Sequence, residues 1–387
     1  TSNNDQIGNT LDNDPLNDDV YLTFATAEGF RQARILEMLT NSTGLEREPG
    51  AKISFADMSR YQYDFKSKEA ERLVPILLAA AEARPDLVDE EMASALDRLR
   101  EWGVAKPGSP AYDTLSGIDA SELRDDVPPR ETQVSDEERA DAVATSIFAG
   151  WQTRLGRLVF ADDFSGTGVG APGGDDAVKA LLHIIEDIDR TDPGFVVHTK
   201  GDNGESTLWD DKRTAPIETK DEILVTALRQ GLTFLTERFA SADQSTWLWG
   251  MIHQVNFQHF FGQAGIGAYD LGPFAAPGAR STVSPAGYSL NSNSFIFSSG
   301  PSKRFVAVLD PAGIRAVNSL PGGANGNPGR LPGQPPSVLF NRINPEIHYG
   351  DHIPGWINGE VFEYRITRSD VEANAERTFS FVPPAAD

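Results

Sequence analysis

The spacing of apolar residues predicts a chain that is helical in its first part and rich in strands in its last part. Residues 28–39 place Phe30, Met38 and their apolar neighbours near a 3.6-residue period, which is typical of an amphipathic helix. Further segments with a helical pattern are 89–102, 136–158, 176–188 and 219–239. After Ser245 the sequence is dominated by Trp, Phe, Gly, Asn and Ser, which indicates short strands joined by turns.

Local signals mark where several of these elements begin and end. Ser54 has Asp57 three positions after it, which is the pattern of a capped helix start. The helical pattern continues beyond it, and Pro75 predicts a break or kink because proline lacks an amide donor. A turn-forming run over 320–329 follows a strand-like segment at 302–310. Helices first and strands later indicate an α+β fold with long insertions.

Bulk composition narrows the classes of protein to which the chain can belong. Of its 387 residues, 39% are hydrophobic, which suffices for a folded core. It has 34 basic and 57 acidic residues, so its net charge of −23 disfavours binding to nucleic acids. Cysteine is absent, which excludes disulfides, thiolate nucleophiles and cysteine metal sites. The sequence has no apolar run long enough for a membrane span, and the first residues lack a signal-peptide pattern.

Candidate chemistry gathers at the start of the chain. A terminal Thr1, or Ser2 beside it, can act as a nucleophile whose proton is taken by a free α-amine. The simpler interpretation is that Thr1 only marks where the chain was cut. Oxygen ligands are dense over 12–14 and 17–19, which suits either Ca²⁺ or a solvated acidic loop.

The histidines favour structural roles. His348 and His352 have the spacing of a zinc pair on a helix, but a glycine between them and a nearby proline argue against that helix. His253 and His259 would share one face of an extended segment, and no third ligand stands close by in the sequence. We therefore expect polar contacts and packing at these positions.

Taken in order, several segments resemble the penicillin acylases, which are amidases with an N-terminal nucleophile. The similar segments are 2–8, 12–18, 29–35, 53–58, 70–75, 300–305, 320–329, 348–351, 356–360 and 370–371. Their order covers nearly the whole chain and is similar to the later two-thirds of the family's large β subunit. The run between 329 and 348 is longer than the family pattern.

The resemblance implies two catalytic roles. Asn3 corresponds to the family's oxyanion-hole asparagine, with Asn4 as the alternative register. Arg31 falls where the family has an active-site arginine on a helix, and it would support the active-site geometry or meet a substrate carboxylate.

The resemblance also implies a metal site and the position of the nucleophile. Asp19 or Asp18 corresponds to a ligand of a structural calcium ion, and no organic cofactor is expected. In the family a terminal Ser stands well before the Asn-Asn segment, whereas here that segment comes at once. The resemblance therefore places the nucleophile outside this chain, with Thr1 and Ser2 as outside candidates.

For the fold, the resemblance implies part of a four-layer αββα N-terminal-nucleophile hydrolase sandwich with a large helical insertion. We expect 1–26 to hold the strand near the active site and the metal-binding loop. Residues 27–240 would be mainly helical, and 241–387 would be the β-rich region that completes the sandwich. Together they would form one structural domain that is shared with another chain.

The implied function is an amide hydrolase that cleaves N-acyl compounds such as β-lactam side chains or acyl-homoserine lactones. The resemblance implies a periplasmic or secreted heteromer, processed from one precursor into an α subunit and pieces of β. Its partners would be a small N-acyl substrate and those processed chains, with no nucleic acid. The alternatives are a self-contained hydrolase with Thr1 or Ser2 as nucleophile, and a non-catalytic acidic binding protein of the same fold.

Overall fold

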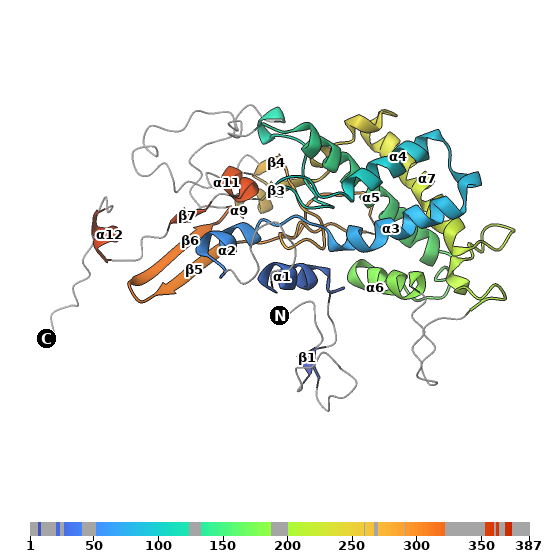
Figure 1. Ribbon diagram of the computed structural model, residues 1–387, viewed down its shortest axis with the longest axis horizontal. Coiled ribbons are helices and arrows are strands. Elements are labelled where there is room, and N and C mark those ends of the chain that lie inside the picture. Colours follow the sequence, from blue (N-terminus) through green and yellow to red (C-terminus); the bar gives the residue numbers. More distant parts are fainter. Residues whose placement is uncertain are drawn as a thin grey trace. The chain divides into compact units, whose positions relative to one another are not determined.

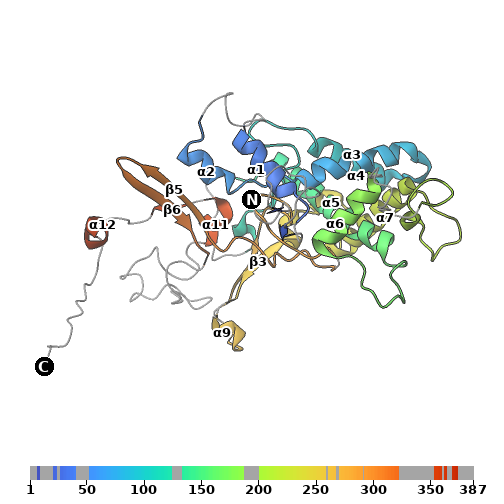
Figure 2. The ribbon, with the colours of Figure 1, turned by 90° about the horizontal axis from the view of Figure 1, so that it is seen from below.

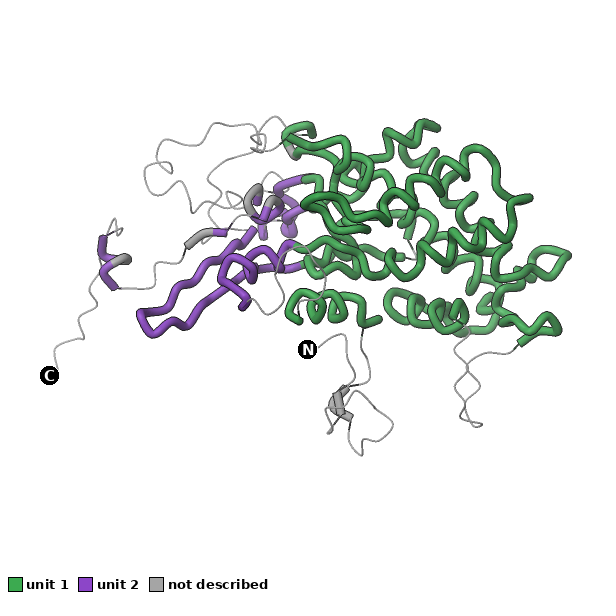
Figure 3. The backbone as a smooth tube through the Cα atoms, viewed as in Figure 1, with its two compact units in different colours: residues 1–51, 64–255, 273–300 green, residues 52–63, 256–272, 301–387 purple. Residues whose placement is uncertain are grey.

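The computed structural model describes most of the sequence, and Figures 1 and 2 show it from two directions. The described residues are 7–8, 21–23, 27–40, 52–123, 133–186, 200–258, 260–266, 270–290, 292–321, 353–359, 361–363 and 368–373. The chain divides into two compact units, each assembled from stretches far apart in the sequence (Figure 3). Unit 1 comprises 1–51, 64–255 and 273–300, and unit 2 comprises 52–63, 256–272 and 301–387.

Unit 1 is built mainly from helices. Its α-helices are α1 (Phe30–Thr40), α3 (Lys68–Ala83), α4 (Glu90–Trp102), α5 (Asp136–Phe160), α6 (Gly174–Ile185), α7 (Lys220–Phe239) and α8 (Trp249–Ile252). Single 3₁₀ turns lie at Pro85–Leu87, Ala120–Glu122, Thr207–Trp209 and Gln244–Thr246. Two short strands, β1 (Ile7–Gly8) and β2 (Tyr21–Thr23), pair in antiparallel fashion.

Helix α5 lies at the centre of the core of unit 1. Helix α7 packs against α5 and α3, and α4 packs against α5 (Figure 1). The core includes tryptophans whose indole N–H groups donate to backbone carbonyls. Trp102 donates to Asp113 O at 2.8 Å, and Trp151 donates to Leu224 O at 3.0 Å. These bulky side chains are therefore buried without leaving a polar group unsatisfied.

Two glycines allow α5 and α7 to approach closely. A Cβ atom at Gly231 of α7 would lie 2.9 Å from the backbone nitrogen of Trp151, and one at Gly150 of α5 would lie 2.9 Å from a methyl of Leu235. Because a backbone atom cannot move aside as a side chain can, the crossing requires a residue without Cβ at Gly231.

Side-chain caps fix several helix starts where the sequence indicates them. Ser54 Oγ accepts from the N–H of Asp57 at 3.1 Å, and the carboxylate of Asp57 accepts from the N–H of Ser54 at 2.7 Å. Thr219 and Glu222 form the same reciprocal pair at the start of α7, and Asp89 caps α4. Each cap satisfies amide donors that the helix itself leaves open.

Of the break or kink predicted at Pro75, the break is wrong, while the kink stays a prediction. Helix α3 runs through Pro75, and the chain leaves the helical conformation earlier, between α2 (Phe55–Tyr61) and Ser67, the N-cap of α3. Pro75 is exposed, whereas Val74 and Leu77 beside it are buried. Burial of the flanking apolar side chains outweighs the hydrogen bond that proline removes.

Unit 2 combines short helices with a three-stranded sheet. Its elements are α2, α9 (Phe260–Gln263), β5 (Arg304–Asp310), β6 (Gly313–Ser319), α11 (Ile353–Asn358), β7 (Phe362–Glu363) and α12 (Arg368–Ala373). The sheet order is β5-β6-β7, and the β5–β6 hairpin pairs from Arg304 with Ser319 to Asp310 with Gly313. Helix α2 packs against β5. Strands β3 (Gln254–Phe257) and β4 (Leu271–Ala275) form a separate pair.

The predicted α+β class is confirmed, with the long helices before 253 and, apart from β1 and β2, the described strands after it. The predicted helices all appear within a few residues of their expected bounds, and β5 confirms the strand at 302–310. Only the first two residues of the run 320–329 lie within the described residues. The described strands form sheets of two and three strands, and the division at 26 and 240 stays a prediction.

Candidate functional site around helix α1

The resemblance assigns an active-site arginine to α1, and the structure shows how this helix is held. Gly29, with φ at 86°, turns the chain into α1 just before Phe30. Arg31 is half-buried on the first turn, and its side chain forms no ion pair or hydrogen bond with another described residue. The first expected site residues, Thr1, Ser2, Asn3 and Asn4, lie outside the described residues, as do Asp18 and Asp19.

A buried ion pair fixes the middle of α1. The Arg34 side chain is 3% exposed, and its Nε and Nη2 donate to the carboxylate of Asp64 at 3.0 Å and 2.6 Å. Its Nη1 also donates to Glu37 at 3.1 Å. Burial lowers the pKa of Arg34, but its hydrogen bonds to Asp64 and Glu37 outweigh that effect and raise it. The guanidinium is therefore charged, and its Nε, Nη1 and Nη2 all donate to carboxylates.

The ion pair extends into a chain of alternating charges. Lys68, the first residue of α3, donates to Glu37 at 2.8 Å and also pairs with Glu71. Lys66 donates to Glu71 at 2.7 Å. Although burial raises the pKa of Glu37, the hydrogen bonds from Lys68 and Arg34 lower it overall. This alternation ties α1 to the start of α3.

A second buried cluster lies at the residue before α1. The Glu28 side chain, 4% exposed, accepts from Arg280 Nη2 at 2.8 Å, and the same guanidinium pairs with Asp175 of α6. Glu69 of α3, 3% exposed, lies 3.6 Å from Arg280. Burial and the nearby charge of Glu69 raise the pKa of Glu28 to about 7, against the opposing effect of Arg280. Three carboxylates thus share one guanidinium.

Neutral donors complete the second cluster. Gln152 of α5 donates to Glu69 Oε1, and Ser281 Oγ donates to Glu69 Oε2 at 2.8 Å. Burial and the charge of Glu69 raise the pKa of the nearby Tyr288, so its phenol stays protonated. Glu69 can therefore remain a buried acceptor because donors from α5 and from residue 281 surround it.

Together the two clusters hold α1 on both sides of Arg31. Arg31 stands three residues after Glu28 and three before Arg34, so the backbone that carries it is fixed by buried charges at each end. A guanidinium on such a backbone can orient a carboxylate or a neighbouring loop without first ordering its own helix. The two clusters therefore hold the backbone of Arg31 in one position.

Neither cluster was predicted from the sequence, although one has a signal there. Arg34 stands four residues after Phe30 and four before Met38, which puts a charge in the apolar stripe of the helix. A charged residue at such a position needs a buried partner. Glu28 and Arg280 are 252 positions apart, so no local pattern could have joined them.

Two further buried titratable groups lie in unit 1. The His253 ring is stacked between Trp249 and Phe297, and its Nδ1 lies 2.6 Å from Phe295 O. Burial lowers the pKa of His253 to about 4, so the ring is neutral, and the packing role that we expected for it agrees with these contacts. Burial also raises the pKa of Asp113 to about 7, with a smaller contribution from Asp64.

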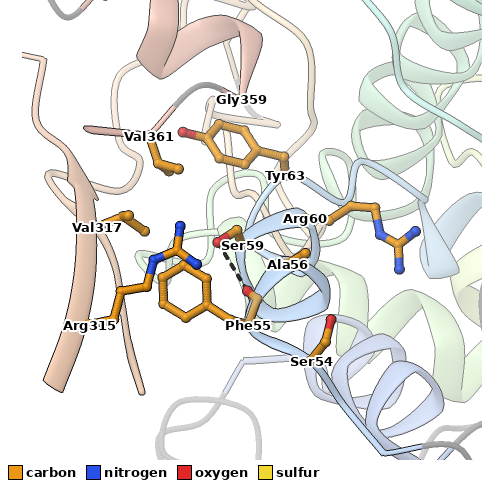
Figure 4. A pocket seen from close by; sticks show the side chains of 10 residues that line it. All are labelled: Ser54, Phe55, Ala56, Ser59, Arg60, Tyr63, Arg315, Val317, Gly359 and Val361. Atoms are coloured by element: carbon orange, nitrogen blue, oxygen red, sulfur yellow. Dashed lines mark hydrogen bonds between the residues drawn. The ribbon is translucent and has the colours of Figure 1, made fainter. Parts of the chain in front are cut away.

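Unit 2 contains a cavity of about 720 Å³ between α2 and the sheet. Figure 4 shows Arg315 of β6 pointing toward Phe55 of α2, and its guanidinium lies 4.6 Å from the centre of that ring. The other lining residues are Ser54, Ala56, Ser59, Arg60, Tyr63, Val317, Gly359 and Val361. The walls are mixed in polarity.

Within the described residues, no group of three or more His, Asp or Glu side chains is placed to hold a metal ion. The calcium site expected at Asp19 or Asp18 lies outside them and stays a prediction. The described helices also include none that is long and apolar enough to cross a membrane.

Comparisons with known proteins agree with the resemblance. The family model for penicillin amidase matches residues 1–373. The acyl-homoserine lactone acylase QuiP of Pseudomonas aeruginosa is 27% identical over 177 residues, which is 41% of this chain and 18% of that protein. QuiP of Pseudomonas fluorescens is 25% identical over 177 residues, covering 45% of this chain and 18% of the relative. The matched part is thus about a fifth of each relative's length.

A solved structure shows a weaker likeness. Thermostable penicillin G acylase from Alcaligenes faecalis is 13% identical, with a TM-score of 0.41, over 88% of this chain and 55% of that chain.

Proposed function

Because the chain belongs to the penicillin amidase family, we propose that it forms part of an acylase that hydrolyses the amide bond of N-acyl compounds. The observation that carries the proposal is the match of the family model over residues 1–373. Helix α1 supports it, since buried charges fix the helix where the resemblance needs an active-site arginine. The names of the relatives favour acyl-homoserine lactones over β-lactam side chains as substrates.

In the proposed mechanism the nucleophile is a terminal Ser on a separate polypeptide of the same precursor. Its hydroxyl oxygen attacks the amide carbonyl, and its own α-amine takes the hydroxyl proton and passes it to the leaving nitrogen. The C–N bond breaks and leaves an acyl ester, which water hydrolyses to the free acid. The side-chain amide of Asn3, or of Asn4, donates to the oxyanion that forms in both steps.

Arg31 and a calcium ion have structural roles in the proposed enzyme. Arg31 positions the oxyanion-hole segment or the substrate. A structural calcium ion bound through Asp19 or Asp18 would order the segment between Asn3 and α1. We place the enzyme in the periplasm or outside the cell, as an acidic heteromer assembled from one precursor after autoproteolytic processing.

The test measures release of homoserine lactone from an N-acyl-homoserine lactone by this chain together with its Ser-bearing polypeptide. Asn3→Ala should lower kcat by about 100- to 1000-fold, because one oxyanion donor is lost. Arg31→Ala should also lower kcat/KM, whereas Arg238→Ala, on an exposed position of α7, should not. Full activity of Asn3→Ala and of Asn4→Ala would refute the assignment.

A further variant separates the proposal from a self-contained enzyme. If the nucleophile is the Ser of another polypeptide, Thr1→Ala and Ser2→Ala keep their activity. Loss of activity in either, with this chain active alone, would place the nucleophile here instead.

A further inference from the structure

The cavity between α2 and the sheet of unit 2 is lined by positive charge in a protein that is acidic as a whole. Among the described residues, the ten that line it include two arginines and no Asp or Glu. The whole chain has 57 acidic and 34 basic residues. All ten lining residues belong to unit 2, so the cavity is formed within one compact unit. This local reversal of charge favours an anionic ligand.

Arg315 is the cation that a ligand in this cavity meets. Arg315 and Val317 are two positions apart on β6, so both side chains point to the same face of the sheet. The guanidinium of Arg315 lies 4.6 Å from the ring centre of Phe55 (Figure 4). A guanidinium stacked on a ring uses its flat face, whereas its N–H groups point outward in its plane and can donate to both oxygens of a carboxylate. Figure 4 shows Arg60 turned away from Arg315, and Arg60 pairs with Asp57 at 2.7 Å.

The remaining walls suit an apolar group beside the anion. Val317 is buried in the sheet, and Val361 lines the cavity near the hydroxyl of Tyr63, as Figure 4 shows. The ring of Tyr63 is held by Arg304, whose guanidinium lies 4.1 Å from the ring centre and donates to Gln62 O. The volume of about 720 Å³ falls within the range of about 300 to 1,000 Å³ that is typical of small-molecule sites. The cavity therefore combines one cation with apolar walls.

We propose that this cavity binds a small organic acid, with its carboxylate on Arg315 and its apolar chain against Val317 and Val361. The planar guanidinium matches the two oxygens of a carboxylate, and burial of the chain adds the stabilisation that an exposed ion pair lacks. The site uses neither Asn3 nor Arg31, so it goes beyond the proposed function and does not depend on it. Hydrolysis of an N-acyl compound releases an acid of this class, which gives the site a source of ligand.

The experiment measures binding of octanoate to the full chain by equilibrium dialysis at neutral pH. We expect a Kd of about 1 mM or below. Octanamide has the same chain without the charge, and acetate has the same charge without the chain. Each should bind at least about 10-fold more weakly than octanoate. The absence of octanoate binding up to about 10 mM, or equal binding of octanamide, overturns the proposal.

Two variants locate the bound octanoate. Arg315→Gln removes the charge, and Ala56→Phe places a ring in the cavity from an exposed position of α2. Each should weaken octanoate binding at least about 10-fold. The matched control is Arg238→Gln, which removes an exposed arginine of α7 and should bind octanoate within about 2-fold of the unchanged chain. Thermal melting checks that each variant is folded, and Ala56→Phe decides the test if Arg315→Gln does not fold.

The outcomes separate this cavity from the proposed active site. Unchanged octanoate binding by Arg315→Gln and Ala56→Phe, with unchanged melting, overturns the proposal even if amide hydrolysis is found. Loss of binding in Arg31→Gln but not in Arg315→Gln also overturns it, because the acid then binds near the proposed active site. Weaker binding in both cavity variants of a protein that cleaves no amide supports the cavity and rejects the proposed function alone.

Discussion

The two compact units of this chain differ in the kinds of side chain that they bury and expose. Unit 1 encloses charges such as Glu69 and Arg280 and gives them partners, and its tryptophans are buried. Unit 2 leaves apolar side chains such as Leu309 and Ile314 exposed on a three-stranded sheet. Buried ion pairs persist only when their surroundings are complete. The contrast teaches that buried charges with counter-charges are what distinguishes the described part of unit 1, because single apolar side chains such as Ile217 are exposed there too.

Removal of Arg280 should have the largest effect on the free energy of unfolding. The variant Arg280→Ala leaves Glu28 and Glu69 buried side by side without a counter-charge. We expect a loss of about 3 to 5 kcal/mol in the free energy of unfolding. Urea unfolding followed by tryptophan fluorescence measures it, because Trp102, Trp151 and other buried tryptophans report on unit 1.

The control for this variant is Arg238→Ala, which removes an exposed arginine of α7. It should change the free energy of unfolding by no more than about 0.5 kcal/mol. Equal losses in both variants would show that the buried cluster contributes nothing specific.

The pH dependence of stability should be the next largest effect. The folded-state pKa values of Glu28 and Asp113 are raised to about 7 by burial. Between about pH 4.5 and 7 the folded chain therefore binds more protons than the unfolded chain, so the free energy of unfolding falls as pH rises through this window. Each carboxyl accounts for on the order of 3 kcal/mol.

The variant Glu28→Gln isolates one of these groups. It should flatten the fall in stability between about pH 4.5 and 7, whereas Glu372→Gln, with a side chain 60% exposed, should not. Thermal melting across this pH range gives the two slopes. Parallel slopes for Glu28→Gln and the unchanged chain would mean that Glu28 does not titrate there.

A smaller effect is expected at the crossing of α5 and α7. Gly231→Ala places a Cβ atom against the backbone of Trp151 and should cost about 1 to 3 kcal/mol. Gly156→Ala in α5 has nothing within 4 Å of the new atom and should stabilise by up to about 1 kcal/mol through helix propensity. Chemical denaturation of both variants checks the sign, and a stable Gly231→Ala would show that the helices can separate.

The smallest effect should come from unit 2. Leu309→Ala removes a side chain that is 81% exposed, so the free energy of unfolding of the chain alone should change by less than about 0.5 kcal/mol. Leu228→Ala in α7, where the leucine is fully buried, should cost about 2 to 5 kcal/mol. Thermal melting of the two variants measures these changes. Comparable losses of stability at the two positions would contradict the difference between the units.

Much of the local structure could be predicted from the sequence. Periodicity located the helices, and the pairs Ser54–Asp57 and Thr219–Glu222 mark their starts because caps act over three residues. The break expected at Pro75 failed because buried neighbours decide whether a proline is tolerated, and burial depends on the whole fold.

The candidate site could be predicted only in part. Arg31 was located by resemblance, and the structure places it on a helix as expected. The Glu28–Arg280 pair joins residues 252 positions apart, so no pattern along the chain could reveal it. The same holds for the exposure of Leu309, which depends on what packs beside it and not on its own segment.

The central claim is that buried ion pairs hold α1 on both sides of Arg31. Hydrogen exchange of the backbone amides of α1 tests it most directly, in the unchanged chain and in Arg280→Ala. We predict that the amides of α1 are protected in the unchanged chain and exchange at least about 100-fold faster in Arg280→Ala. Protection of α1 that is the same in both samples would contradict the claim.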